Sequence, residues 1–240
     1  MQGAWSPKEQ HMAPVSALIT HEIEQHEPRP DLQVARLSFD ILGMIAAEPT
    51  SVEVQVLRPG RTIELVEATA EIGGRTVVRC RAWRLSRHDS SAVAGGEPAR
   101  MPGPDGIPPW SLPDAWGGGF IDSVEGREVP GSVPGRSRAW LHTDLALVEG
   151  VACSPLARFI SLVDTINGVS ARVSPSEWMF PNTDLTLHFW RTPTDPTWVG
   201  LEGAATFGQD GVGVTAGLLH DVDGPLGRSE QILTVRPLRR

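Results

Sequence analysis

The chain has 240 residues, with 21 lysines and arginines against 29 aspartates and glutamates, and its formal net charge is −8. This length allows one large domain or two of ordinary size, and two small domains are the starting expectation. The acidic balance, with no basic cluster outside the last few residues, argues against a nucleic-acid partner. No apolar run is long enough to span a bilayer, so no membrane association is expected.

The two cysteines, Cys80 and Cys153, lie far apart and lack the spacing of a metal or redox motif. Both are therefore expected to be small buried apolar residues in a reducing compartment. The chain does not open with a basic segment followed by an apolar run, as a secretory signal would. These features predict a soluble cytoplasmic protein that needs no metal and no other cofactor.

In the first half, one helix precedes several strands. Pro14 at a first-turn position, followed by apolar residues at helical spacing, predicts an amphipathic helix that ends near Gln25. Alternating apolar residues and glycine-containing turns then predict an antiparallel meander. Its strands are expected at Val34 to Ile45, residues 52–56, Ile63 to Ile72 and Val77 to Leu85.

A change of composition marks the middle of the chain. From Ser86 to Gly119, prolines alternate with glycines and the apolar periodicity disappears. This predicts a linker at residues 89–118 between an N-terminal domain (1–88) and a C-terminal domain (119–240). Trp110 and Trp116 within the linker indicate that parts of it dock onto the body of the protein.

The second half contains the clearest helix signal. Ser154 is a typical N-cap, Pro155 suits the first helical position, and an apolar stripe leads to the exit at Asn167-Gly168, which together predict a helix at 154–168. Strands are expected on both sides of this helix. They are Phe120 to Glu125, Arg138 to Leu145, Asp184 to Trp190, Trp198 to Phe207, Val212 to His220 and Arg228 to Val235.

The strand that starts at Asp184 alternates strictly, so Asp184, Thr186 and His188 share one face and leucines occupy the other. A carboxylate at the start of a strand can activate water, or it can simply accept a hydrogen bond from the nearby backbone. The order helix, long strand, then three strands separated by glycine turns is the same in both halves. This repetition indicates an ancient duplication of an α+β unit in which a sheet wraps one helix.

Several stretches carry a family resemblance. Among them are Arg58-Pro-Gly-Arg-Thr-Ile-Glu-Leu-Val-Glu-Ala68, Arg81-Ala-Trp-Arg84, Asn167-Gly-Val-Ser170 followed by Ala171-Arg-Val, and Asn182-Thr-Asp-Leu-Thr-Leu-His188. In this order they resemble the acyl-CoA thioesterase II-like family. The resemblance implies an α+β tandem double hotdog, with two antiparallel sheets that each wrap one long helix. The N-terminal hotdog would lack its first strand, because little sequence precedes its helix.

The same resemblance implies hydrolysis of an acyl-CoA thioester by activated water, a reaction of fatty acid metabolism. Asp184, Thr206 and Gln231 match the Asp, hydroxyl and Gln residues that hold this water in the family. An ionised Asp can accept the proton of water, while a hydroxyl and an amide fix its orientation. His11 and His188 are candidate substrate contacts, and an oxyanion is expected at the turn before Pro14 or the one after Ser154.

Two functions stay open at this point. One is a hydrolase with an acyl-CoA substrate, and the other is a catalytically silent hotdog that binds an acyl group or serves in assembly. When the repeats are aligned, Asp184 matches Ser38 and Gln231 matches Arg81, so only the second half is expected to be catalytic. Edge strands and an apolar face that need covering predict a homodimer.

Overall fold

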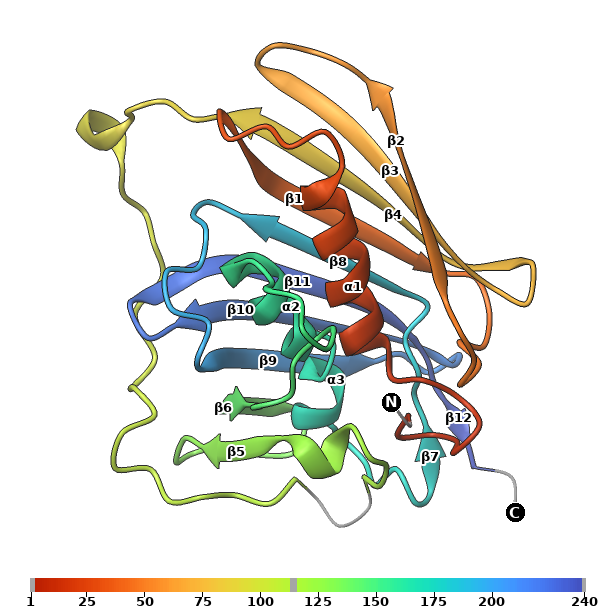
Figure 1. The fold of residues 1–240 in the computed structure, drawn as a ribbon. Helices are drawn as coiled ribbons and strands as arrows, with labels where there is room; N and C mark the ends of the chain where they lie inside the picture. Colours follow the sequence, from red (N-terminus) through yellow and green to blue (C-terminus); the bar gives the residue numbers. More distant parts are fainter. Residues whose placement is uncertain (1–2, 113–115, 239–240) are drawn as a thin grey trace.

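The computed structural model describes residues 3–112 and 116–238, and most of its strands join one ten-stranded antiparallel sheet (Figure 1). The α-helices of the described residues lie on one face of this sheet. They are α1 (Met12–Gln25), α2 (Pro155–Val163) and α3 (Ile166–Val169). The opposite face of the sheet is called the outer face below.

The strands follow the predicted order closely. The first half supplies β1 (Leu32–Ile41), β2 (Ser51–Arg58), β3 (Ile63–Ile72) and β4 (Arg75–Ser86). The second half supplies β5 (Glu125–Glu128), β6 (Arg136–His142), β8 (Asp184–Phe189), β9 (Val199–Phe207), β10 (Val212–Asp221) and β11 (Gly224–Thr234). A separate pair consists of β7 (Trp178–Met179) and β12 (Arg236–Pro237), and short 3-10 turns occur at Ser91–Val93 and Ile121–Ser123.

The sheet is continuous across the two halves, so the expectation of two sheets is wrong in this respect. Its order is β2-β3-β4-β1-β8-β11-β10-β9-β6-β5, and β1 joins β8 in an antiparallel ladder from Arg36↔His188 to Asp40↔Asp184. The order on one side of this junction, β1-β4-β3-β2, mirrors β8-β11-β10-β9 on the other. The halves join because each one presents its first long strand as an edge that the other can pair.

The two longer helices begin as the sequence indicates. His11 caps α1, where its Nδ1 accepts a hydrogen bond from the Ala13 N–H, and Ser154 caps α2 through the Ala157 N–H. The predicted helix at 154–168 is broken, however, because α2 ends at Val163 and α3 starts only at Ile166. At the break, the hydroxyl of Thr165 donates to the Leu162 carbonyl and competes with the helical ladder.

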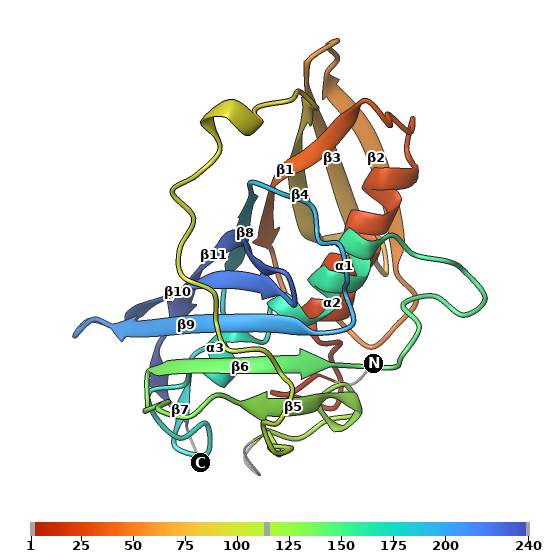
Figure 2. The ribbon, with the colours of Figure 1, turned by 90° about the vertical axis from the view of Figure 1, so that its left-hand side faces the viewer.

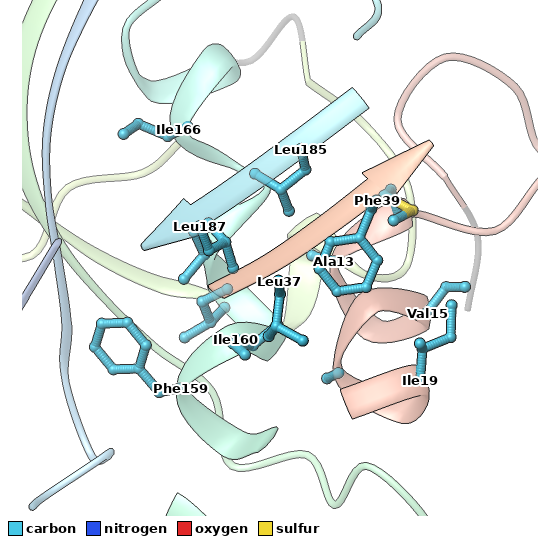
Figure 3. Close-up of a cluster of buried hydrophobic side chains, with 14 of the residues drawn as sticks. Ala13, Val15, Ile19, Leu37, Phe39, Phe159, Ile160, Ile166, Leu185 and Leu187 are labelled. Carbon is cyan, nitrogen blue, oxygen red and sulfur yellow. The ribbon is translucent and has the colours of Figure 1, made fainter. Parts of the chain in front are cut away.

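The core lies between the helices and the β1–β8 junction, as Figure 3 shows. Leu37 and Phe39 of β1, and Leu185 and Leu187 of β8, are fully buried. Ile19 of α1 and Phe159 and Ile160 of α2 are buried with them, and α1 packs against α2. This cluster contains residues from both halves, so the halves share one core.

The proline-rich segment packs on the second half. Met101 forms a buried cluster with Trp140, and the Trp140 Nε1–H donates to the Pro102 carbonyl at 2.7 Å. Trp110 bonds the backbone of Gly126, and Trp116 is buried, so the expected docking of both tryptophans is confirmed. Figure 2 shows this segment, coloured yellow to green, passing in front of β9 and β6.

Two local predictions are wrong. The expected strand from Phe120 to Glu125 is mostly the 3-10 turn Ile121–Ser123, and β5 starts only at Glu125. Cys80 is buried as expected, but Cys153 is only half-buried, because it lies in the loop that leads to α2.

Candidate active site

A cavity of about 360 Å³ lies where the two halves meet. Its wall comes from the start of α1, the loop after β1, the break between α2 and α3, and the segment before β8. Apolar residues such as Trp5, Met12 and Trp116 form much of the lining, and Asp164 and His11 add polar groups. A partly apolar cavity with a few convergent polar groups is the usual form of a small-molecule site.

Asp164 is the buried carboxylate of this cavity. It caps the C-terminus of α2, and its Oδ1 accepts hydrogen bonds from Asn182 Nδ2 and Gln231 Nε2, both at 2.8 Å. Its Oδ2 lies 3.8 Å from His11 Nδ1. Burial raises the pKa of Asp164 to about 6, although the two amide bonds favour the ionised form. One oxygen is thus held by the protein, while the other faces the histidine.

His11 is neutral at physiological pH. Burial lowers its pKa to about 4, and its Nδ1 accepts from the Ala13 N–H, so Nε2 carries the proton. The ring lies against Phe120, with centroids 4.5 Å apart. The contact with Asp164 is therefore not an ion pair at neutral pH, and His11 can offer a hydrogen-bond donor.

The predicted site residues fall on two faces of the sheet. Gln231 is buried on the helix side of β11, where it holds Asp164, and His11 lines the cavity. Asp184 pairs with Asp40 on the outer face, Thr206 is exposed on the same face of β9, and His188 is exposed on that face of β8. The structure thus brings His11 near Gln231 through Asp164, and it separates both from the other three.

Asp184 has a structural partner of its own. Its Oδ1 accepts the backbone N–H of Ile232 at 2.6 Å, which ties the start of β8 to β11. Partial burial raises the pKa of Asp184, the Ile232 bond opposes this, and the nearby carboxylates of Asp40 and Glu230 raise it further.

Asp164 and Asn182 are not among the residues predicted from the sequence. A signal for Asp164 was present, because it follows Ile160 by four residues and so extends the buried stripe of the helix. A carboxylate on a buried stripe needs partners, which marks it as a candidate functional group. Asn182 gives no such signal, since its bond to Asp164 depends on the tertiary fold.

Within the part of the chain that the structure describes, no helix has the length and apolar character that crossing a membrane requires. Within residues 3–112 and 116–238, no three His, Cys, Asp or Glu side chains are grouped so that they could hold a metal ion.

Solved structures resemble this chain over nearly its whole length. A conserved protein of unknown function with a hot dog fold from Alicyclobacillus acidocaldarius has a TM-score of 0.75 and 18% identity, with 98% of this chain and 90% of that chain covered. The acyl-CoA thioesterase II TesB2 from Mycobacterium marinum has a TM-score of 0.68 and 17% identity, with 94% and 90% covered. At such identities these similarities show the fold alone.

A search among curated proteins found no match. Two family models do match: the acyl-CoA thioesterase N-terminal domain at residues 1–85 and the acyl-CoA thioesterase C-terminal domain at residues 104–235. The chain therefore belongs to the acyl-CoA thioesterase family and is a thioesterase with an α+β hotdog fold.

Proposed function

We propose that the protein hydrolyses an acyl-CoA thioester to a free acid and CoA, with Asp164 as the general base. The observation that carries this proposal is the unequal use of the two oxygens of Asp164. Asn182 and Gln231 hold Oδ1, whereas Oδ2 accepts from no amide of the described residues and lies beside His11 at the cavity. A base that is fixed by one oxygen can accept a proton on the other without losing its orientation.

In the proposed reaction, water loses a proton to Oδ2 of Asp164 as its oxygen attacks the thioester carbonyl carbon. The carbon becomes tetrahedral and its carbonyl oxygen becomes negatively charged. When this intermediate collapses, the carbon–sulfur bond breaks and the proton passes from Asp164 to the leaving thiolate. The products are the free acid and CoA, and Asp164 regains its ionised form.

The start of α1 is placed to stabilise the oxyanion. Met12 and His11 line the cavity, and α1 has 14 residues, so the positive end of its dipole lies at the cavity wall. We assign the backbone N–H of Met12 and the Nε2–H of His11 as donors. Of the two turns expected from the sequence, the one before Pro14 lines this cavity.

Gln231 keeps a role in the proposed site, but as a positioning residue. Its Nε2 holds Asp164, and its Oε1 is buried without a hydrogen-bond partner among the described residues. The assignment made from sequence, with Asp184 as the base and Thr206 beside it, remains the alternative. Because both residues lie on the outer face, it needs a substrate site on that face of the sheet.

Asp164→Asn and Asp184→Asn distinguish these assignments. We expect Asp164→Asn to lower kcat by about a hundredfold or more, as loss of a general base does. The Asn oxygen can still accept from Asn182 and Gln231, so the fold is expected to remain intact. The measurement is thiol release from a panel of acyl-CoA substrates, and Asp144→Asn, at a carboxylate with a 97% exposed side chain, is the matched control.

A large loss in Asp184→Asn with full activity in Asp164→Asn would place the base at Asp184. If wild type releases no thiol from any substrate but binds CoA in calorimetry, the catalytically silent alternative gains support. Binding of CoA by Asp164→Asn shows that the loss of turnover is not a loss of the fold.

We also propose how the chain is divided into domains. The mirrored strand order supports a tandem double hotdog, with domains at 1–88 and 119–240 and a linker at 89–118. A homodimer is also proposed, because the sheet ends in two edge strands, β2 and β5, that a second copy could cover.

A further inference from the structure

The wall of the cavity contains an amide that the proposed reaction does not use. Asn167 of α3 lines the cavity. Its side chain is buried, with 9% of the residue exposed, and makes no hydrogen bond with another described residue. Three other neutral polar side chains of the wall are bonded within the protein: those of Gln10, Thr165 and Asn182. A buried amide without a partner is costly, so Asn167 is suited to bind a polar group of the substrate.

Asn167 lies one helical turn beyond Asp164. The two residues that lead into α3 have near-helical dihedral angles, with φ −62° and ψ −16° at Asp164 and φ −68° and ψ −8° at Thr165. Residues three apart on a helix are neighbours, with Cβ atoms about 5–6 Å apart. Since both Asp164 and Asn167 line the cavity, a group that the amide binds lies close to the carbon that water attacks.

Trp116 adds a second unpaired donor on the same wall. Its ring lies over Gly168, where a Cβ atom would be 3.6 Å from the indole. The indole Nε1–H is buried and has no acceptor among the described residues. Trp116 also packs edge to face on Trp5 and Phe180, with ring centroids 4.9 and 5.7 Å away. The wall around Asn167 thus combines apolar rings with donors that lack an oxygen acceptor.

We propose that the cavity selects acyl groups with a hydroxyl or keto oxygen on the second or third carbon, and that Asn167 recognises this oxygen. The inference rests on the proposed hydrolysis, because that reaction places the thioester carbon beside Asp164. Carbon–carbon bonds are about 1.5 Å long, so two of them bring the third carbon towards the amide one helical turn away. The amide oxygen accepts from a hydroxyl, and the amide nitrogen donates to a keto oxygen.

The expected selectivity follows from the burial of Asn167. An acyl group of the same length without the oxygen would fill the apolar part of the cavity but leave the amide unpaired. A site built to hydrogen-bond a substrate discriminates strongly against an analogue that lacks the bonding group. We therefore expect 3-hydroxybutyryl-CoA to be preferred over butyryl-CoA by roughly tenfold or more.

Binding tests the proposal without turnover. Titration calorimetry on the full chain with Asp164→Asn should give a Kd for 3-hydroxybutyryl-CoA about tenfold or more below that for butyryl-CoA. Adding Asn167→Leu, which removes the amide at similar volume, should bring the two values together. Gln209→Leu makes the same kind of change in an exposed turn and should leave the preference intact. Circular dichroism checks the fold of each variant.

Thiol release completes the test. With Asp164 present, the ratio of kcat/KM for the two thioesters should show the same preference, and Asn167→Leu should bring this ratio close to one. Equal affinities for the two thioesters when Asn167 is present would overturn the inference, whether or not the Leu variant folds. A preference that survives in a folded Asn167→Leu would also overturn it. If neither thioester releases thiol but the binding preference is found and depends on Asn167, the inference stands and the proposed hydrolysis fails.

Discussion

Asp164 combines two opposing effects on a single carboxyl group. Burial disfavours its charge, while hydrogen bonds from Asn182 and Gln231 favour it, and the pKa settles at about 6. Because the pKa in the folded protein is about two units above the unfolded value, the protonated Asp164 stabilises the fold by ~3 kcal/mol relative to the ionised form. This stabilisation is present below the unfolded pKa near 4 and is lost as pH rises through 6. The ionised base that the reaction needs is therefore held at a cost in folding free energy.

The pH dependence of turnover follows from this group. With Asp164 as the base, kcat/KM should be level above about pH 7 and should fall about tenfold per unit below about pH 6. His11 titrates lower, near 4, so it should not limit this range. Thiol release between about pH 5 and about pH 8 measures the profile. A level profile down to pH 5 would contradict a base with a raised pKa.

At the same scale, the sequence predicted the types of residue in the site better than the tertiary contacts between them. Gln231 was predicted from the family resemblance and His11 as a possible substrate contact, and in the structure both lie beside Asp164. Asp164 and Gln231 are 67 positions apart, and their contact depends on how α2 lies on β11. Asp184 was predicted as the base because it opens a strand and matches the Asp of the family, and neither feature tells which face of the sheet carries the cavity.

At the scale of the elements, periodicity predicted most helices and strands to within a few residues. The start of α2 at Ser154-Pro155 is confirmed, because capping is a local interaction. Its early end was not predicted, because the break accompanies the tertiary bonds of Asp164. The union of the two halves into one sheet was not predicted for a similar reason: the β1–β8 ladder joins residues from Arg36↔His188 to Asp40↔Asp184, which are far apart in the sequence.

The C-terminus of α1 shows one element stabilised by another. Its last turn contains no basic residue, and Arg84 of β4 instead donates to the carbonyls of Ile23, His26 and Glu27. The same guanidinium bonds Glu64 at 3.0 Å, and both side chains of this pair are 5% exposed. A cation at this end also interacts favourably with the helix dipole.

Arg84→Met should therefore destabilise the protein by about 3–5 kcal/mol. The buried carboxylate of Glu64 would keep only the contact with Arg29 at 3.5 Å, and the three carbonyls at the end of α1 would lose a donor. Urea unfolding followed by circular dichroism measures this loss. Asp31→Asn, which removes only an exposed partner of Arg29, should leave the midpoint nearly unchanged. Adding Glu64→Leu to Arg84→Met should recover part of the loss, and no recovery would mean that the carbonyl bonds dominate.

At the scale of the whole molecule, the mirrored halves are unequal in chemistry. The strand order makes β4 the counterpart of β11. Arg81, the match expected for Gln231, lies on the outer face, and the buried helix-side residues of β4 at this level are Cys80 and Ala82. The first half thus offers no amide in the place of Gln231, which agrees with a single site per chain.

Because the two halves share one sheet, we expect them to unfold together. Leu37 of β1 and Leu187 of β8 are directly paired, fully buried and in contact with a core that contains both helices. Neither half can lose this junction without exposing apolar surface of the other, so we expect one cooperative transition in calorimetry, with equal calorimetric and van't Hoff enthalpies. Leu187→Ala should lower the free energy of unfolding by about 2–5 kcal/mol and shift the entire transition. Ala152→Gly, in the exposed loop before α2, is the control and should shift it little. Two resolved transitions, of which Leu187→Ala moves only one, would show that the halves unfold independently despite the continuous sheet.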